Sequence, residues 1–88
     1  MTFYYVYVIE STDQDFRYTG VTNNLERRLK EHNNRKEPST KAYAPLELIF
    51  YEGYRSKSDA KRREEYLKST KGKRVLRRML RDYFDNDT

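Results

Sequence analysis

Arg28 and His32 lie four residues apart in the stretch LERRLKEHN. Both fall on the side of the predicted helix that also carries Leu25 and Leu29, because residues three or four apart share a helix face. A guanidinium is a planar fork suited to binding a phosphate. The pair therefore indicates a site for phosphate chemistry. The alternatives are a salt bridge from Arg28 to a glutamate and a packed or capping role for His32.

Tyrosines surround the same region of the sequence. The chain has nine of them, and most must serve packing. Tyr5 and Tyr7 point to one side of an expected strand because side chains alternate along a strand, and Tyr18 lies across the hairpin that follows. A phenol beside a divalent cation and an arginine loses its proton more easily than its ordinary pKa of about 10 suggests. Gly20 either ends a strand or allows a backbone or ligand to approach closely.

Glu64 is the candidate metal ligand. In the segment AKRREEYLK it shares a helix face with Ala60 and Leu67, so its carboxylate should be partly buried. A buried carboxylate needs a cation or hydrogen-bond donors. That cation is either a metal ion or a basic side chain such as Lys68 or Arg28. Lys68 itself either pairs with Glu64 or reaches a phosphate.

Three segments with many Tyr, Val, Ile or Phe residues predict strands: 3–10, 16–20 and 46–54. The first is apolar on both faces, which is typical of a central strand covered on both sides. The turn at 11–15 joins the first two strands as an antiparallel hairpin. On the third strand, Leu48, Phe50 and Glu52 are expected to share one face.

Three segments predict helices. Asn23 and Glu26 form a capping box for a helix that ends in the polar loop before Pro45. Ser56 and Asp59 form another capping box, for a helix that runs to about Ser69. Gly72 is expected to break the chain before a last helix over 73–84, whose apolar stripe is Leu76, Met79, Leu80 and Tyr83. The fold class is α/β: one domain over 1–88, with a small three-stranded, mainly antiparallel sheet flanked by helices, in the order β-β-α-β-α-α.

The composition of the chain limits which kinds of metal site it can form. The chain has no cysteine and one histidine, which excludes disulfides, thiolate zinc sites and multi-histidine metal sites. Carboxylates are the remaining metal ligands, and they suit Mg²⁺ or Mn²⁺. No apolar run approaches the roughly 20 residues that span a membrane, and the N-terminus lacks the features of a signal peptide. We therefore expect a soluble cytoplasmic protein.

Charge is unevenly distributed. The chain has a net charge of +5, but residues 55–81 hold 12 Lys or Arg against three Asp or Glu, a net charge of +9. A basic segment of this kind indicates a polyanionic partner, most often a nucleic acid; the alternative is a solvated charged surface. The residues expected to contact it are Arg28, Lys68, Lys71, Lys73, Arg74 and Arg77.

Together these residues resemble the GIY-YIG nuclease superfamily, most closely its small stand-alone bacterial members. The segment Tyr5-Val6-Tyr7 resembles the first motif, and Tyr18-Thr19-Gly20 resembles the second. The further matches are Arg28 ten residues after Tyr18, His32, Glu64 four residues after Ala60, Lys68, and the STK triplet at 39–41. The sequence departs from the family pattern at Tyr5, where the name has Gly, and at Thr19, where it has Ile.

The resemblance implies a function. A GIY-YIG nuclease hydrolyses DNA phosphodiester bonds with one divalent cation, Mg²⁺ or Mn²⁺. The implied roles are Glu64 for the metal, Arg28 for the phosphate oxygens, Tyr7 or Tyr18 for the attacking water, and His32 as an aid to either role. Such an enzyme is expected to be structure-selective and linked to DNA repair or processing. The alternatives are a nucleic-acid-binding module without catalysis and a protein-interaction domain; the oligomeric state stays open.

Overall fold

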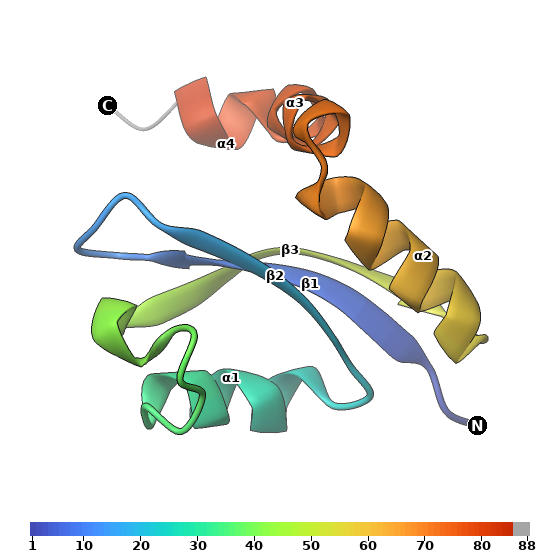
Figure 1. The fold of residues 1–88 in the computed structure, drawn as a ribbon, viewed down its shortest axis with the longest axis horizontal. Helices are drawn as coiled ribbons and strands as arrows, with labels where there is room; N and C mark the ends of the chain where they lie inside the picture. Colours follow the sequence, from blue (N-terminus) through green and yellow to red (C-terminus); the bar gives the residue numbers. More distant parts are fainter. Residues whose placement is uncertain (86–88) are drawn as a thin grey trace.

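The first predicted strand is central, as its two apolar faces indicate. A computed structural model of the chain describes residues 1–85 and shows one antiparallel sheet in the order β2-β1-β3 (Figure 1). The strands are β1 (Tyr4–Ser11), β2 (Arg17–Thr22) and β3 (Leu46–Tyr54). The predicted fold class is confirmed, and positions 86–88 of the predicted domain lie outside the described residues.

The helices cover the two faces of the sheet separately. α1 (Leu25–Asn33) lies against one face, while α2 (Lys57–Lys68) and α3 (Thr70–Met79) lie on the other (Figure 1). A short α4 (Arg81–Asp85) follows, and a single 3-10 turn, η1 (Lys41–Tyr43), interrupts the long loop before β3. No helix within residues 1–85 is long and apolar enough to cross a membrane.

The alternation of β1 side chains builds two cores. Val6 and Val8 are buried with Ala60, Leu67 and Leu76 on the face covered by α2 and α3. On the opposite face, the cluster that lies toward α1 is Tyr7, Ile9, Ala44 and Leu46. Because neighbouring strand residues face opposite ways, Tyr7 is directed toward α1 while its neighbours hold α2.

A bulge in β3 corrects the predicted face of that strand. Phe50 lies opposite Val8, but Leu48 rather than Ile49 lies opposite Ile9. One extra residue in a strand reverses the side on which the following residues lie. Leu48 consequently packs with the cluster toward α1, whereas Phe50 packs with the cluster toward α2. The prediction that Leu48 and Phe50 share a face is wrong.

Neither predicted capping box is formed at the start of α1 or α2. Asn24, not Asn23, caps α1, and its side chain accepts a hydrogen bond from Arg27 N at 3.0 Å. Glu26 is then the second helical residue, one position short of completing a capping box with Asn24. Ser56 does precede α2, but its side chain makes no capping hydrogen bond. Both predicted capping boxes are therefore wrong, although the predicted helices exist.

Gly72 does not break the chain. It lies inside α3, and the helix boundary falls at Ser69, whose hydroxyl accepts a hydrogen bond from Gly72 N. A Cβ at Gly72 would overlap Tyr66 O and lie 2.8 Å from Leu67 Cα. Glycine is required there because α2 and α3 meet backbone to backbone. The predicted helix over 73–84 is instead divided at Leu80 into α3 and α4.

Candidate active site

Tyr7 is the centre of a buried hydrogen-bonded cluster beneath the sheet. Its hydroxyl lies 2.8 Å from His32 Nε2 and 3.2 Å from Arg28 Nε. The other ring nitrogen of His32, Nδ1, lies 2.8 Å from the hydroxyl of Thr40. His32 and Thr40 are completely buried. Strand β1, helix α1 and the following loop thus each supply a member of one chain of hydrogen bonds.

One assignment of the protons gives every group in this series of hydrogen bonds a partner. Arg28 can only donate, so the Tyr7 oxygen accepts from Arg28 Nε and gives its own proton to His32 Nε2. His32 then carries its proton on Nδ1 and donates it to Thr40 Oγ1, which lies 3.5 Å from the carbonyl oxygen of Glu37. This assignment rests on the hydrogen-bond network, since ring protons are inferred from their partners.

Two carboxylates fix the Arg28 guanidinium. Nη1 donates to Glu31 at 3.1 Å and Nη2 donates to Glu37 at 2.8 Å. The hydroxyl and the backbone N–H of Ser39 donate to Glu37 in turn. The salt bridge that the sequence left open for Arg28 is therefore present. It places a fixed, half-buried cation beside the Tyr7 hydroxyl.

The protonation states follow from burial and from this cation. Burial raises the pKa of Tyr7 to about 12, although the hydrogen bond from Arg28 opposes the rise. Burial, then the charge of Arg28, lowers the pKa of His32. The hydrogen bond from Arg28 lowers the pKa of Glu37 to about 2. At neutral pH, Tyr7 is protonated, His32 is neutral, and Glu37 is charged.

Tyr18 completes the aromatic side of the cluster. Its ring centroid lies 5.2 Å from that of His32 and 6.4 Å from that of Tyr7. Gly20 lies directly opposite Tyr7 in the β1–β2 ladder, and a Cβ there would lie 2.6 Å from the Tyr7 hydroxyl. Of the two interpretations of Gly20, the structure supports close approach: glycine makes room for the Tyr7 ring.

Glu64 is on α2, across the sheet from α1. Its carboxylate is 12% exposed and forms an ion pair with Lys68 at 3.1 Å. No hydrogen bond or ion pair within residues 1–85 joins Glu64 to Tyr7, Tyr18 or Arg28. The structure therefore brings Tyr7, Tyr18, Arg28 and His32 together, while the place of Glu64 in the same site stays a prediction.

A family model described as the GIY-YIG catalytic domain matches residues 3–79. The chain belongs to the GIY-YIG family. A UPF0213 protein from Clostridium perfringens is 42% identical over 65 residues, which are 73% of this chain and 69% of the relative. The UPF0213 protein YazA from Bacillus subtilis is 39% identical over 75 residues, which are 83% and 75% of the two chains.

A solved structure agrees with this assignment. The solution NMR structure of a UPF0213 protein from Bacillus halodurans matches with a TM-score of 0.54 and 32% identity, covering 88% of this chain and 84% of that one. The resemblance drawn from the sequence motifs is confirmed. The GIY-YIG domain is a nuclease fold, and its nucleases generally use a divalent metal.

The acidic residues present are compatible with a metal ion that has few protein ligands. Within residues 1–85 no group of three or more His, Cys, Asp or Glu side chains could hold a metal. Mg²⁺ keeps several of its waters and often binds through one or two carboxylates. That Glu64 holds Mg²⁺ or Mn²⁺ stays a prediction, and its ion pair with Lys68 would have to open for the metal to bind.

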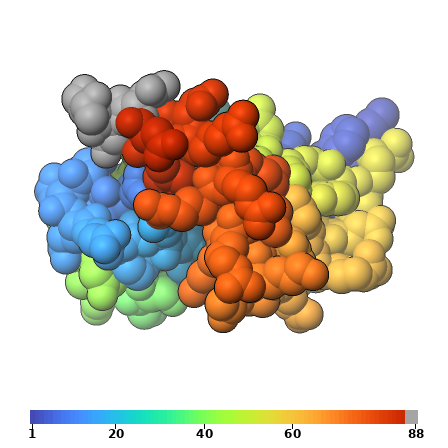
Figure 2. Space-filling model, turned by 90° about the horizontal axis from the view of Figure 1, so that it is seen from above, coloured from blue at the N-terminus to red at the C-terminus, as the bar shows by residue number. Residues whose placement is uncertain are grey.

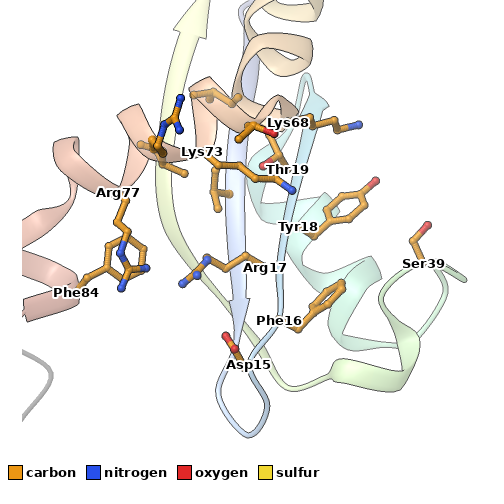
Figure 3. A pocket seen from close by; sticks show the side chains of 15 residues that line it. Asp15, Phe16, Arg17, Tyr18, Thr19, Ser39, Lys68, Lys73, Arg77 and Phe84 are labelled. Atoms are coloured by element: carbon orange, nitrogen blue, oxygen red, sulfur yellow. The ribbon is translucent and has the colours of Figure 1, made fainter.

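A basic hollow of about 870 Å³ runs along the outer edge of β2 (Figure 3). Its cationic lining residues are Arg17, Lys68, Lys73, Arg74 and Arg77. All of these except Arg17 are among the residues predicted to contact a nucleic acid. Lys71 is also predicted to do so; it is exposed but does not line the hollow. Figure 2 shows the β1–β2 hairpin in blue beside α3 and α4 in red and orange.

Sequence reasoning missed four residues of this region. Glu31 follows Arg28 by three residues, so helix spacing offered a signal for that pair. The STK triplet offered one for Thr40. Glu37 and Arg17 gave no signal, because each contacts a partner that is distant in the sequence or in a different element.

Proposed function

We propose that this GIY-YIG domain is an endonuclease that hydrolyses phosphodiester bonds in DNA with one divalent cation. The observation that carries the proposal is the buried Arg28–Tyr7–His32 chain, with hydrogen bonds of 3.2 and 2.8 Å. A tyrosine that gives its proton to a neutral imidazole can take a proton from water at the same time. This supports Tyr7 rather than Tyr18 as the proposed base.

The proton and the phosphate are handled by different groups. Water attacks phosphorus, its proton passes to the Tyr7 oxygen, and the Tyr7 proton passes to His32 Nε2. The bond from phosphorus to the leaving oxygen breaks as the new bond to the water oxygen forms. Burial keeps His32 neutral and able to accept the proton. Arg28 binds non-bridging phosphate oxygens through its guanidinium edge.

The remaining roles belong to Tyr18, Glu64 and the bound cation. The Tyr18 ring, packed on His32, orients the water and excludes bulk solvent. Glu64 holds the cation. When bound there, the cation would stabilise negative charge on the phosphate and the leaving oxygen. The basic hollow supports DNA as the substrate. We further propose that the enzyme is cytoplasmic, is structure-selective and acts in DNA repair or processing.

A nucleic-acid-binding module without catalysis is the second candidate. It is favoured by the internal pairing of the site: Lys68 already neutralises Glu64, while Glu31 and Glu37 occupy two nitrogens of Arg28. A substrate phosphate and a metal must replace or share these contacts for catalysis to occur.

Cleavage of labelled DNA structures with and without Mg²⁺ or Mn²⁺ separates the two candidates. The variant is Glu64→Gln, which removes the carboxylate charge but keeps its shape; the matched control is Glu65→Gln, the exposed neighbour on α2. We expect Glu64→Gln to abolish metal-dependent cleavage while DNA binding persists or improves, because one negative charge near the phosphate is lost. Glu65→Gln should cut at the wild-type rate.

Two results would contradict the proposal. A wild-type protein that binds DNA but cuts none of the structures would support the binding module. A folded Glu64→Gln protein that cuts at the wild-type rate would exclude the metal role of Glu64. Melting temperatures of both variants show whether either substitution acts by unfolding the chain.

A further inference from the structure

The hollow along β2 has a shape and lining that suit one form of nucleic acid. We infer that it seats a single-stranded DNA segment and leads that strand to the Tyr7–His32 cluster. The inference rests on the proposed function and deepens it, because it names the part of a DNA substrate that contacts this surface. The argument uses the charge of the hollow, its aromatic rings and its position.

The charge of the hollow favours a phosphate backbone. Five basic side chains line it against one acidic one, Asp15. Within residues 1–85 no carboxylate forms an ion pair with Lys73, Arg74 or Arg77. All three come from one helix, α3, and line the hollow; Figure 3 shows Lys73 and Arg77 on the same side of it. Unpaired cations in a row can follow successive phosphates of a strand.

Aromatic side chains line the same hollow. Phe16, which directly precedes β2, and Tyr18 on β2 lie on the side of Ser39, while Phe84 lies on the side of α3 (Figure 3). Phe16 stacks on Tyr43, with ring centroids 3.7 Å apart and planes within 3° of parallel. This stacking fixes the Phe16 ring, so that it can receive a base without being ordered first.

Phe84 brings two arginines to one point of the hollow. The guanidinium carbon of Arg17 on β2 lies 4.8 Å from the centroid of the Phe84 ring, and that of Arg77 on α3 lies 5.1 Å from it. A guanidinium packed on a ring keeps its N–H edges for other partners. Arg17 also donates from Nη1 to Glu10 at 2.8 Å, so a phosphate between the two walls would meet the remaining N–H groups of Arg17 and those of Arg77.

These features match a single strand better than a duplex. The bases of a duplex are stacked on one another, so their faces are not available to Phe16 or Tyr18. Duplex DNA is read by an element that protrudes into a groove, whereas this surface is concave. Basic grooves with aromatic platforms are typical of single-strand binding.

The position of the hollow connects it to the candidate active site. Tyr18 lines the hollow and also packs on His32. Ser39, at the opposite rim, binds Glu37, the partner of Arg28. A strand lying in the hollow therefore passes the cluster at Tyr18. The inferred substrate is DNA with a single-stranded portion next to the bond that is cut.

Binding of fluorescent oligodeoxynucleotides, measured by anisotropy without divalent metal, tests the inference. The probes are a single strand, a blunt duplex of the same sequence, and that duplex with a single-stranded overhang. We expect the single strand and the overhang to bind at least tenfold more tightly than the blunt duplex. Equal or tighter binding of the blunt duplex would overturn the inference.

Two groups of variants locate the binding. Lys73→Gln with Arg77→Gln removes two charges from the hollow; Lys61→Gln with Arg62→Gln removes two exposed charges of α2 outside it. We expect the first pair to weaken single-strand binding at least tenfold, and the control pair by much less. Equal losses from the two pairs would show that only total charge matters and would overturn the inference.

Phe16→Leu tests stacking while keeping an apolar side chain beside Tyr43. Loss of one stacked base corresponds to about a tenfold weaker affinity, expected for the single strand and not for the blunt duplex. If this variant does not fold, NMR of the wild-type protein decides instead. Single-strand addition should shift resonances of β2 and α3 rather than those of the outer side of α1; the reverse pattern would overturn the inference.

Failure of this inference is distinguishable from failure of the proposed function. A protein that binds single strands through the hollow but cuts no DNA would retain the inference and lose the endonuclease activity. In the opposite outcome, the protein cuts duplex DNA with Mg²⁺, Glu64→Gln abolishes cutting, and the α3 substitutions leave DNA binding unchanged. That result would support the endonuclease activity and contradict the inference.

Discussion

At the scale of the residue, the site is organised by the effect of burial on Tyr7 and His32 and by the effect of Arg28 on Glu37. Tyr7 keeps its proton because burial raises its pKa to about 12, and His32 stays neutral because burial lowers its pKa. Arg28 stays charged and holds Glu37 charged as well. The result is a neutral donor–acceptor pair, Tyr7 and His32, beside a fixed cation, which is the arrangement that the proposed mechanism uses.

These pKa shifts predict two pH windows of acid destabilisation. The folded pKa of His32 lies below its ordinary value of 6.5, so the unfolded chain binds its proton first, and folding free energy is lost as pH falls below about 6.5. The pKa of Glu37 falls from 4.5 to about 2 on folding. Its contribution to the free energy of folding is therefore lost as pH falls from about 4.5 toward 2. Melting temperatures measured from pH 8 to pH 3 should show both declines.

The variant His32→Gln isolates the upper window. The chain has one histidine, so the decline between pH 7 and pH 5 should disappear in this variant, although it melts at a lower temperature at pH 7.5. A decline of unchanged size in His32→Gln would show that His32 is not responsible for it.

At the scale of the element, the sheet and helices are held by a few exact contacts between segments. Asn33, the last residue of α1, exchanges two hydrogen bonds with the backbone of Leu46 at 2.7 and 2.9 Å. Arg63 on α2 binds both carboxylate oxygens of Glu52 on β3. α1 and α2 are thus each fixed to β3, which holds the helices that carry Arg28 and Glu64 on opposite faces of one sheet.

The meeting of α2 and α3 predicts an unusual effect of Gly72→Ala. Alanine normally stabilises a helix interior by about 1 kcal/mol relative to glycine, but here its Cβ would overlap the Tyr66 carbonyl. Backbone cannot yield as a flexible side chain does, so the expected net effect is a loss of about 1–3 kcal/mol or more. Urea titration gives the free energy of unfolding.

Gly53→Ala is the matched control for that experiment. A Cβ at Gly53 would lie 3.3 Å from the Tyr5 ring, a side chain at the exposed end of the sheet. We expect a smaller change than for Gly72→Ala. If Gly72→Ala were as stable as wild type, the close approach of α2 and α3 would be incorrect.

At the scale of the whole molecule, the charge is divided between acidic and basic regions. The basic residues of α3 and β2 gather at one hollow, whereas Glu31 and Glu37 lie around Arg28. An approaching polyanion is therefore attracted to the hollow at the edge of β2 before it reaches the cluster beneath the sheet. Under the proposed function, this arrangement would orient a nucleic acid without a sequence-reading element.

The salt dependence of DNA affinity should report this surface. Each phosphate contact releases counterions and adds roughly 0.7–0.9 to the slope of log affinity against log salt concentration. Replacement of Lys73, Arg74 and Arg77 by Glu should weaken binding and lower the slope by about two or more. It should change the melting temperature little, because exposed substitutions cost within about 0.5 kcal/mol.

Lys71→Glu serves as the single-charge control, since Lys71 is exposed on α3 but outside the hollow. Its slope should stay closer to that of the wild type than the slope of Arg77→Glu. Equal slopes for all the variants in a titration from low to moderate salt would show that the hollow is not the binding surface.

The sequence alone determined the order of the elements, the central place of β1 and the shared face of Arg28 and His32. These depend on local periodicity, which the chain carries residue by residue. Three features depend instead on contacts between distant segments, which no local pattern encodes. They are the bulge at Ile49, the need for glycine at position 72 where α2 and α3 meet, and the place of Arg17 beside the Phe84 ring in the hollow. Only the tertiary structure could show that Glu37 holds Arg28 and that the Tyr7 hydroxyl lies 2.8 Å from His32 Nε2, because these contacts join segments that are distant in the sequence.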